Sequence, residues 1–92
     1  MRKFADLPSD VAVDGRGGRL WFSVLDRYVL REDKMEVLTE ACRLLDLVDA
    51  LNAAVTADGP VVGGKSHPAL VELRQVLHEL RRSLAALALP DE

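Results

Sequence analysis

The sequence predicts an all-α fold: a three-helix protomer with a short helix, a long central helix and a C-terminal helix, which assembles into an oligomer. Apolar residues recur three and four positions apart in three segments, about 19–30, 34–56 and from 67 onward. The turn Arg31-Glu32-Asp33 separates the first two segments, and glycine and proline residues separate the second from the third. The length of 92 residues allows one small domain, which we place at residues 19–90 behind a flexible N-terminal arm at 1–18.

The first expected helix covers about residues 19–30. Its apolar face comprises Leu20, Trp21, Val24, Leu25, Tyr28 and Val29. Arg19, Arg27 and Arg31 fall away from this face, as does Arg16 if the helix extends back that far. These arginines predict a basic stripe on the solvent side, with Asp26 at its edge. An ordinary solvated helix face is the alternative.

The central helix is expected at about 34–56, after a capping box formed by Asp33 and Glu36. Its apolar positions include Val37, Leu38, Ala41, Cys42, Leu44, Leu45, Leu47, Val48, Leu51 and Val55. They cover more than half of the helix circumference, whereas packing on one side needs a stripe of only ~100°. Either this helix is the centre of the monomer, or it also packs against another subunit through residues such as Leu44, Leu47 and Leu51.

Residues 56–66 interrupt the helices, and Val61-Val62 between turn residues fits a short β-hairpin and a plain loop equally well. The segment Gly63-Gly64-Lys65-Ser66 lacks the preceding strand that a phosphate-binding loop requires, and Pro68 follows it closely. We therefore treat the likeness as chance.

The third helix is predicted to begin at His67-Pro68, with proline at the first helical position and His67 or Ser66 as the cap. Leu89-Pro90 is expected to stop it. A leucine series runs along it at alternating steps of three and four: Leu70, Leu73, Leu77, Leu80, Leu84 and Leu87. It predicts a core face against the central helix. A second hypothesis is that Leu73, Leu77, Leu80 and Leu84 also join subunits.

The composition limits the function. The net charge is −3, which argues against DNA binding over the whole surface but not through a local patch. No run is long and apolar enough for a membrane span, and no signal-peptide pattern follows Met1, so we expect a cytoplasmic protein. We find no set of catalytic residues, no metal site and no cofactor motif in the sequence. Cys42 lies among apolar residues, His67 is expected to cap a helix, and His78 is expected to be a surface residue. We therefore expect a protein that is not an enzyme.

The order of several short motifs resembles the small terminase subunits of tailed bacteriophages. The motifs are Asp6-Leu7-Pro8, Gly18-Arg19-Leu20-Trp21, the segments 28–33 and 38–46, His67-Pro68-Ala69-Leu70-Val71-Glu72-Leu73-Arg74, and Leu87-Ala88-Leu89-Pro90. The resemblance covers about residues 6–91, and the chain departs from the family in its short length and in an arm that is not strongly basic.

The resemblance implies a ring-forming, non-enzymatic protein of the host cell cytoplasm. Such a protein binds the packaging site on viral double-stranded DNA and delivers it to the large terminase subunit, which carries the ATPase and nuclease. Phosphate contacts would fall to Arg16, Arg19, Arg27, Arg31 and Lys34, with Arg2 and Lys3 as second choices. The alternative is a helical protein–protein interaction adaptor that binds no DNA.

Overall fold

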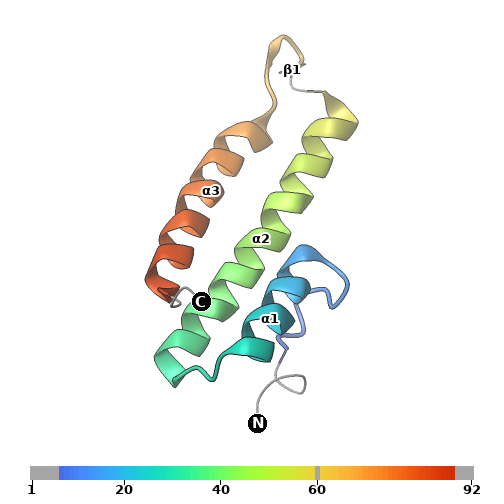
Figure 1. The fold of residues 1–92 in the computed structure, drawn as a ribbon. Helices are drawn as coiled ribbons and strands as arrows, with labels where there is room; N and C mark the ends of the chain where they lie inside the picture. Colours follow the sequence, from blue (N-terminus) through green and yellow to red (C-terminus); the bar gives the residue numbers. More distant parts are fainter. Residues whose placement is uncertain (1–6, 60, 89–92) are drawn as a thin grey trace.

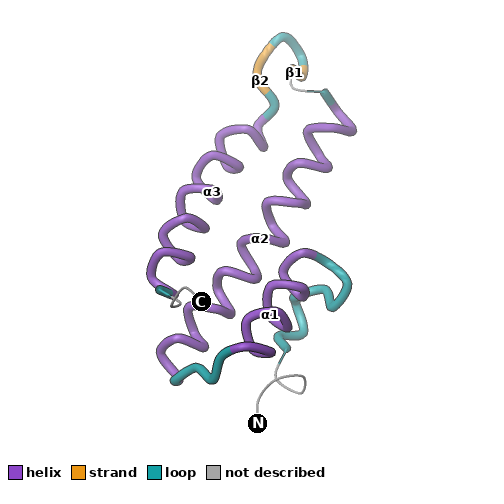
Figure 2. Tube along the Cα trace, viewed as in Figure 1, coloured by secondary structure: helices purple, strands orange, loops and turns teal. Residues whose placement is uncertain are grey.

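The computed structural model describes residues 7–59 and 61–88, and this part of the chain is mostly helical. Three helices, α1 (Arg16–Arg27), α2 (Glu32–Asp58) and α3 (Pro68–Leu87), confirm the predicted all-α class. Figure 1 shows α2 and α3 side by side as a long antiparallel pair, with α1 packed beside only the first half of α2. Figure 2 shows one pair of short strands at the far end of this pair.

Residues 7–15 pack on α2, so the predicted arm at 1–18 is wrong over its described part. Val11 is 4% exposed and belongs to the hydrophobic core. Asp10 forms an ion pair with Arg43 of α2, with 2.8 Å between Oδ2 and Nε. Arg2 and Lys3 lie outside the described residues.

Helix α1 begins and ends earlier than the predicted range of 19–30. It starts at Arg16 because Gly17 and Gly18 allow the chain to approach other backbone closely; a Cβ on Gly17 would lie 2.4 Å from the carbonyl oxygen of Cys42. It ends at Arg27, where Tyr28 turns to an extended conformation. Val29 is consequently 100% exposed, so its predicted place on the apolar face is wrong.

The other apolar positions of α1 confirm its predicted orientation. Trp21 is 1% exposed and Val24 is 6% exposed, and both pack against Met35, Leu38 and Cys42 of α2. The basic side of α1 therefore faces away from the core, because residues on opposite sides of a helix cannot share one packing face.

Helix α2 spans Glu32–Asp58, slightly more than the predicted 34–56. The predicted capping box is wrong, because the N-cap is Arg31 and Asp33 already lies within the first turn. Glu32 and Asp33 instead place negative charge beside the free amide groups of that turn, which the helix dipole favours.

A two-residue turn joins β1 (Val61–Val62) to β2 (Lys65–Ser66), which settles the choice between a loop and a hairpin. Val61 pairs with Ser66 and Val62 with Lys65 in an antiparallel register. Gly63 and Gly64, the turn residues between them, have φ angles of 61° and 80°. Two consecutive positive φ values are typical of tight hairpin turns, and glycine adopts them without strain.

Helix α3 begins as predicted, with Pro68 in the first turn and His67 as its cap. The ring Nδ1 of His67 accepts a hydrogen bond of 3.0 Å from the Ala69 amide. Its Nε2 lies 2.9 Å from Oδ2 of Asp58, so His67 also ties the start of α3 to the end of α2. The helix ends at Leu87; the predicted stop at Leu89-Pro90 lies outside the described residues.

The core has two parts along α2. The first surrounds Trp21 and contains Val11, Val24, Met35, Leu38, Cys42 and Leu87. The second lies between α2 and α3 and contains Ala41, Val48, Val76 and Leu80. Leu73 and Leu77 pack partly against this second cluster, so the middle of the leucine series faces α2, as predicted. Leu84, which is predicted to belong to the same face, is 43% exposed.

Candidate nucleic-acid interface

Helix α1 carries most of the predicted DNA-contacting arginines, and a carboxylate of α2 positions its start. The N-cap residue Gly15 has no side chain to cap the helix. Asp46 takes this role from α2: its Oδ1 accepts a 2.9 Å hydrogen bond from the Gly17 amide, and its Oδ2 accepts a 3.1 Å bond from the Ala12 amide. One carboxylate thus holds both the loop before α1 and the first turn of α1.

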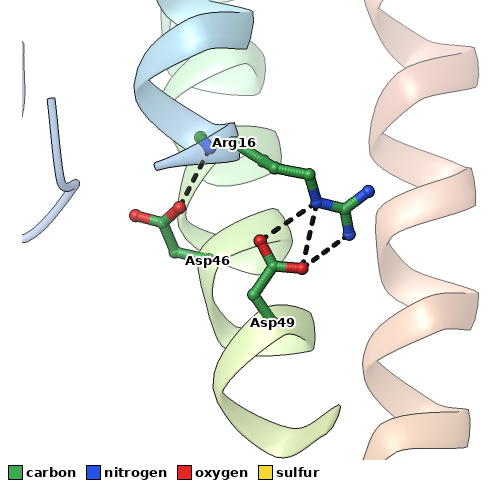
Figure 3. A network of polar contacts seen from close by, with 4 residues as sticks. Arg16, Asp46 and Asp49 are labelled. Atoms are coloured by element: carbon green, nitrogen blue, oxygen red, sulfur yellow. Dashed lines mark hydrogen bonds and ion pairs between the residues drawn. The ribbon is translucent and has the colours of Figure 1, made fainter. Parts of the chain in front are cut away.

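Arg16 is committed to a contact inside the protein. Figure 3 shows its guanidinium beside Asp49, one turn along α2 from Asp46. Its Nε donates to both carboxylate oxygens at 3.0 Å, and Nη2 lies 2.7 Å from Oδ1. This hydrogen bond and the charge of Asp49 raise the pKa of the Arg16 guanidinium above its usual value. Arg16 therefore contributes less free positive charge than the sequence suggested.

Arg19, Arg27 and Arg31 are all exposed. Arg19 lies on the side of α1 opposite Trp21 and Val24, whereas Arg27 lies on a flank of the helix, three positions after Val24. Arg31 ends the extended link Tyr28–Arg31. The Arg31 side chain is 91% exposed and its Nε is 3.9 Å from Asp33 Oδ1, a distance that holds it only weakly. We call Arg19, Arg27 and Arg31 the arginine row.

Lys34 is also engaged within the chain. Its ammonium donates a 2.7 Å hydrogen bond to the carbonyl oxygen of Ala86, near the end of α3. Carbonyl groups at a helix end lack partners and carry partial negative charge, so a lysine there is favourable. Lys34 therefore joins the start of α2 to the end of α3.

The predicted oligomerisation leucines divide by exposure. Leu80 is 7% exposed and is part of the core. Leu44, Leu51, Leu73 and Leu77 are half-buried around the second core cluster. Leu47 and Leu84 are 38% and 43% exposed, so they offer the most apolar surface of this set.

Among residues 7–59 and 61–88, no group of three or more His, Cys, Asp or Glu residues is placed to hold a metal ion. Over the same residues, no helix is long and apolar enough to cross a membrane. The Cys42 thiol is buried, and burial raises its pKa to about 12, with Asp46 adding to the shift. A thiol with so high a pKa stays protonated near neutral pH and is a poor nucleophile.

Comparison of the chain with protein families, with curated proteins and with solved structures finds no match.

Sequence reasoning missed Asp46 and Asp49, which position α1. A signal was present, because Gly15, Gly17 and Gly18 surround the helix start without a capping side chain. A glycine-rich start of this kind requires a cap from elsewhere, but the sequence does not say from where. Of the cations predicted to contact DNA, Arg16 and Lys34 contact Asp49 and the carbonyl oxygen of Ala86, and the arginine row is exposed.

Proposed function

We propose that the protein is a small terminase subunit that binds viral packaging-site DNA as an oligomer and passes it to the large terminase subunit. The order of the terminase-like motifs suggests this function. The observation that carries the DNA-binding part is the arginine row, whose members are all exposed on α1 and on the link that follows it. Guanidinium groups bind phosphate oxygens with directional hydrogen bonds, so such a row suits a DNA backbone.

Several copies are needed for this row to bind DNA firmly. A net charge of −3 gives one protomer no general attraction to DNA. Three phosphate contacts would give a slope of log affinity against log salt of roughly −3 for each protomer. Repetition around an oligomer would multiply the contacts and raise the effective concentration of arginines at the DNA.

The test is fluorescence anisotropy of labelled double-stranded DNA at a series of salt concentrations. Arg27→Ala and Arg31→Ala should weaken binding and reduce the salt slope by about one unit for each lost contact. The control is Lys65→Ala, which removes the same charge from an exposed position in β2. Light scattering should show unchanged assembly in all three variants. Equal loss of affinity with Lys65→Ala would contradict the assignment to the arginine row.

A helical adaptor without DNA binding is the second candidate. It is favoured by the internal contacts of Arg16 and Lys34, which leave fewer cations available to phosphate. Under this alternative, the wild-type protein would form complexes through its half-exposed leucines but would not retain DNA even at low salt. Strong, salt-dependent DNA retention would reject the adaptor.

A further inference from the structure

One flank of α3 presents an unbroken stripe of alternating leucine and arginine. Its members follow one another at steps of four and three, so they are neighbours along the helix surface. We call Leu70, Arg74, Leu77, Arg81 and Leu84 the α3 stripe. The two arginines are exposed and form no ion pair with another described residue, and Leu84 is 43% exposed.

A second stripe runs along α2 at steps of four and three. It begins with two exposed glutamates and continues with leucines. We call this set the α2 stripe; its members are Glu36, Glu40, Leu44, Leu47 and Leu51. Neither glutamate forms an ion pair within the described residues. The nearest cations along the helix, Lys34 and Arg43, contact the Ala86 carbonyl oxygen and Asp10 instead. Two like charges four residues apart on a helix repel each other, so a cation from outside would stabilise this segment.

The two stripes lie on opposite flanks of the α2–α3 pair. A groove of about 400 Å³ opens beside the α2 stripe and is lined by Glu36, Val37, Glu40, Glu79, Arg82, Ser83 and Ala86. On an α-helix, residues two positions apart point in nearly opposite directions. Leu77 and Glu79 are two positions apart, as are Leu84 and Ala86. The α3 stripe therefore faces away from the groove, and one copy cannot satisfy its own glutamates with it.

We propose that, in the oligomer assumed by the proposed function, the α3 stripe of one copy docks onto the α2 stripe of the next, with Arg81 against Glu40. Opposite charge favours this occupant. The groove is lined by Glu36, Glu40 and Glu79 and by one cation, Arg82, which pairs with Glu79. Within the described residues, Glu36 and Glu40 form no ion pair, and neither do the two arginines of the α3 stripe. The apolar members also match, because Leu77 and Leu84 would cover the exposed part of Leu47 and the groove wall at Val37.

The levels of the two stripes agree along the helix pair. Lys34 contacts Ala86, and α2 and α3 run antiparallel (Figure 1), so Glu40, six residues after Lys34, lies near the level of Leu80 and Arg81. A neighbour related by rotation without a shift along the helices therefore brings Arg81 next to Glu40. A head-to-tail contact between two different surfaces without such a shift leads to a closed assembly, not a dimer.

The experiment is a charge swap followed by light scattering at one protein concentration. Arg81→Glu and Glu40→Arg should each shift the wild-type oligomer towards monomer, with subunit affinity at least about tenfold weaker. The double variant Arg81→Glu/Glu40→Arg should regain the wild-type mass. Lys65→Glu, an equal charge reversal in β2, is the control and should assemble normally. The three substituted positions are exposed, so folding should be retained and is checked by circular dichroism.

Three outcomes would overturn the proposal: single variants that assemble like wild type, a double variant that stays monomeric, or a wild-type mass that stops at a dimer. DNA anisotropy on the same samples separates this proposal from the proposed function. If the protein binds DNA in a salt-dependent way but the charge-reversal variants assemble like wild type, the docking surface alone is rejected. Assembly that follows the charge swap without any DNA binding would reject the terminase function alone.

Discussion

Replacing Asp46 by alanine tests how α1 is held on α2. The substitution removes a carboxylate that accepts two hydrogen bonds, one from the partly buried Gly17 amide and one from the exposed Ala12 amide. Bonds to a charged group contribute about 1.5–3 kcal/mol each, and exposure lowers the second contribution. We expect a total loss of about 2–3 kcal/mol in the free energy of unfolding.

A loss of this size corresponds to a fall of about 10–20 °C in Tm for a domain of this length. Urea denaturation followed by circular dichroism measures the free energy of unfolding. The fluorescence of Trp21, the single tryptophan, reports separately on whether α1 leaves α2, because this side chain is 1% exposed. We expect its emission to shift to the red at lower urea in Asp46→Ala than in wild type.

The matched control is Asp49→Ala, which breaks the contact with Arg16 a turn away. Both of those side chains are roughly half exposed, at 41% and 49%, so the loss should be much smaller than for Asp46→Ala. If the two variants unfold at the same urea concentration, Asp46 does not act as the cap of α1 and the reasoning is refuted.

Three further predictions concern Gly17, Cys42 and His67. Gly17→Ala should lower the free energy of unfolding by about 1–3 kcal/mol despite the better helix propensity of alanine, because its Cβ would lie 2.4 Å from the Cys42 carbonyl oxygen; greater stability in urea would contradict this. The Cys42 thiol should resist a disulfide reagent at pH 8 until the protein unfolds. Because burial raises the thiol pKa from about 9 to about 12, only the unfolded protein loses this proton between these pH values. The contribution of the buried thiol to the free energy of unfolding is therefore complete below pH 9 and is lost as the pH rises towards 12. Thermal unfolding in Cys42→Ala should therefore depend less on pH over that range. His67→Ala should cost about 1 kcal/mol in thermal denaturation by removing the cap on Ala69, whereas His67→Asn should keep most of the stability, and equal losses would argue against the cap.

The fold could be predicted where local chemistry decides it. The Pro68 start of α3, its His67 cap and the burial of Trp21 and Val24 follow from periodicity and capping rules that operate within a few residues. The start of α1 could not be predicted in this way. Glycines such as Gly17 and Gly18 usually weaken a helix. They lie within α1 because Gly17 closely approaches Cys42 and Asp46, and Gly18 closely approaches the backbone of Ala12 and Val13.

The candidate site shows the same division. Exposure of Arg19, Arg27 and Arg31 follows from the helical pattern, so the sequence predicts it. The internal contacts of Arg16 and Lys34 depend on residues at least 33 positions away, Asp49 and Ala86. The helical pattern of a single sequence does not show such pairings, so it could not predict these two contacts.

Because α1 packs along only the first half of α2, the free energy of local unfolding should differ between the two ends of the molecule. Helix α1 contacts α2 between Met35 and Asp49, so beyond Asp49 only α2 and α3 support each other. Regions with fewer buried contacts open with a smaller free energy than the whole protein. Backbone amides near Leu38 should therefore exchange with solvent only when the protein unfolds globally. Amides near Val55 should exchange when the end of the α2–α3 pair beside the strands opens without global unfolding. The hydrogen bond between His67 and Asp58 holds α2 and α3 together at that end.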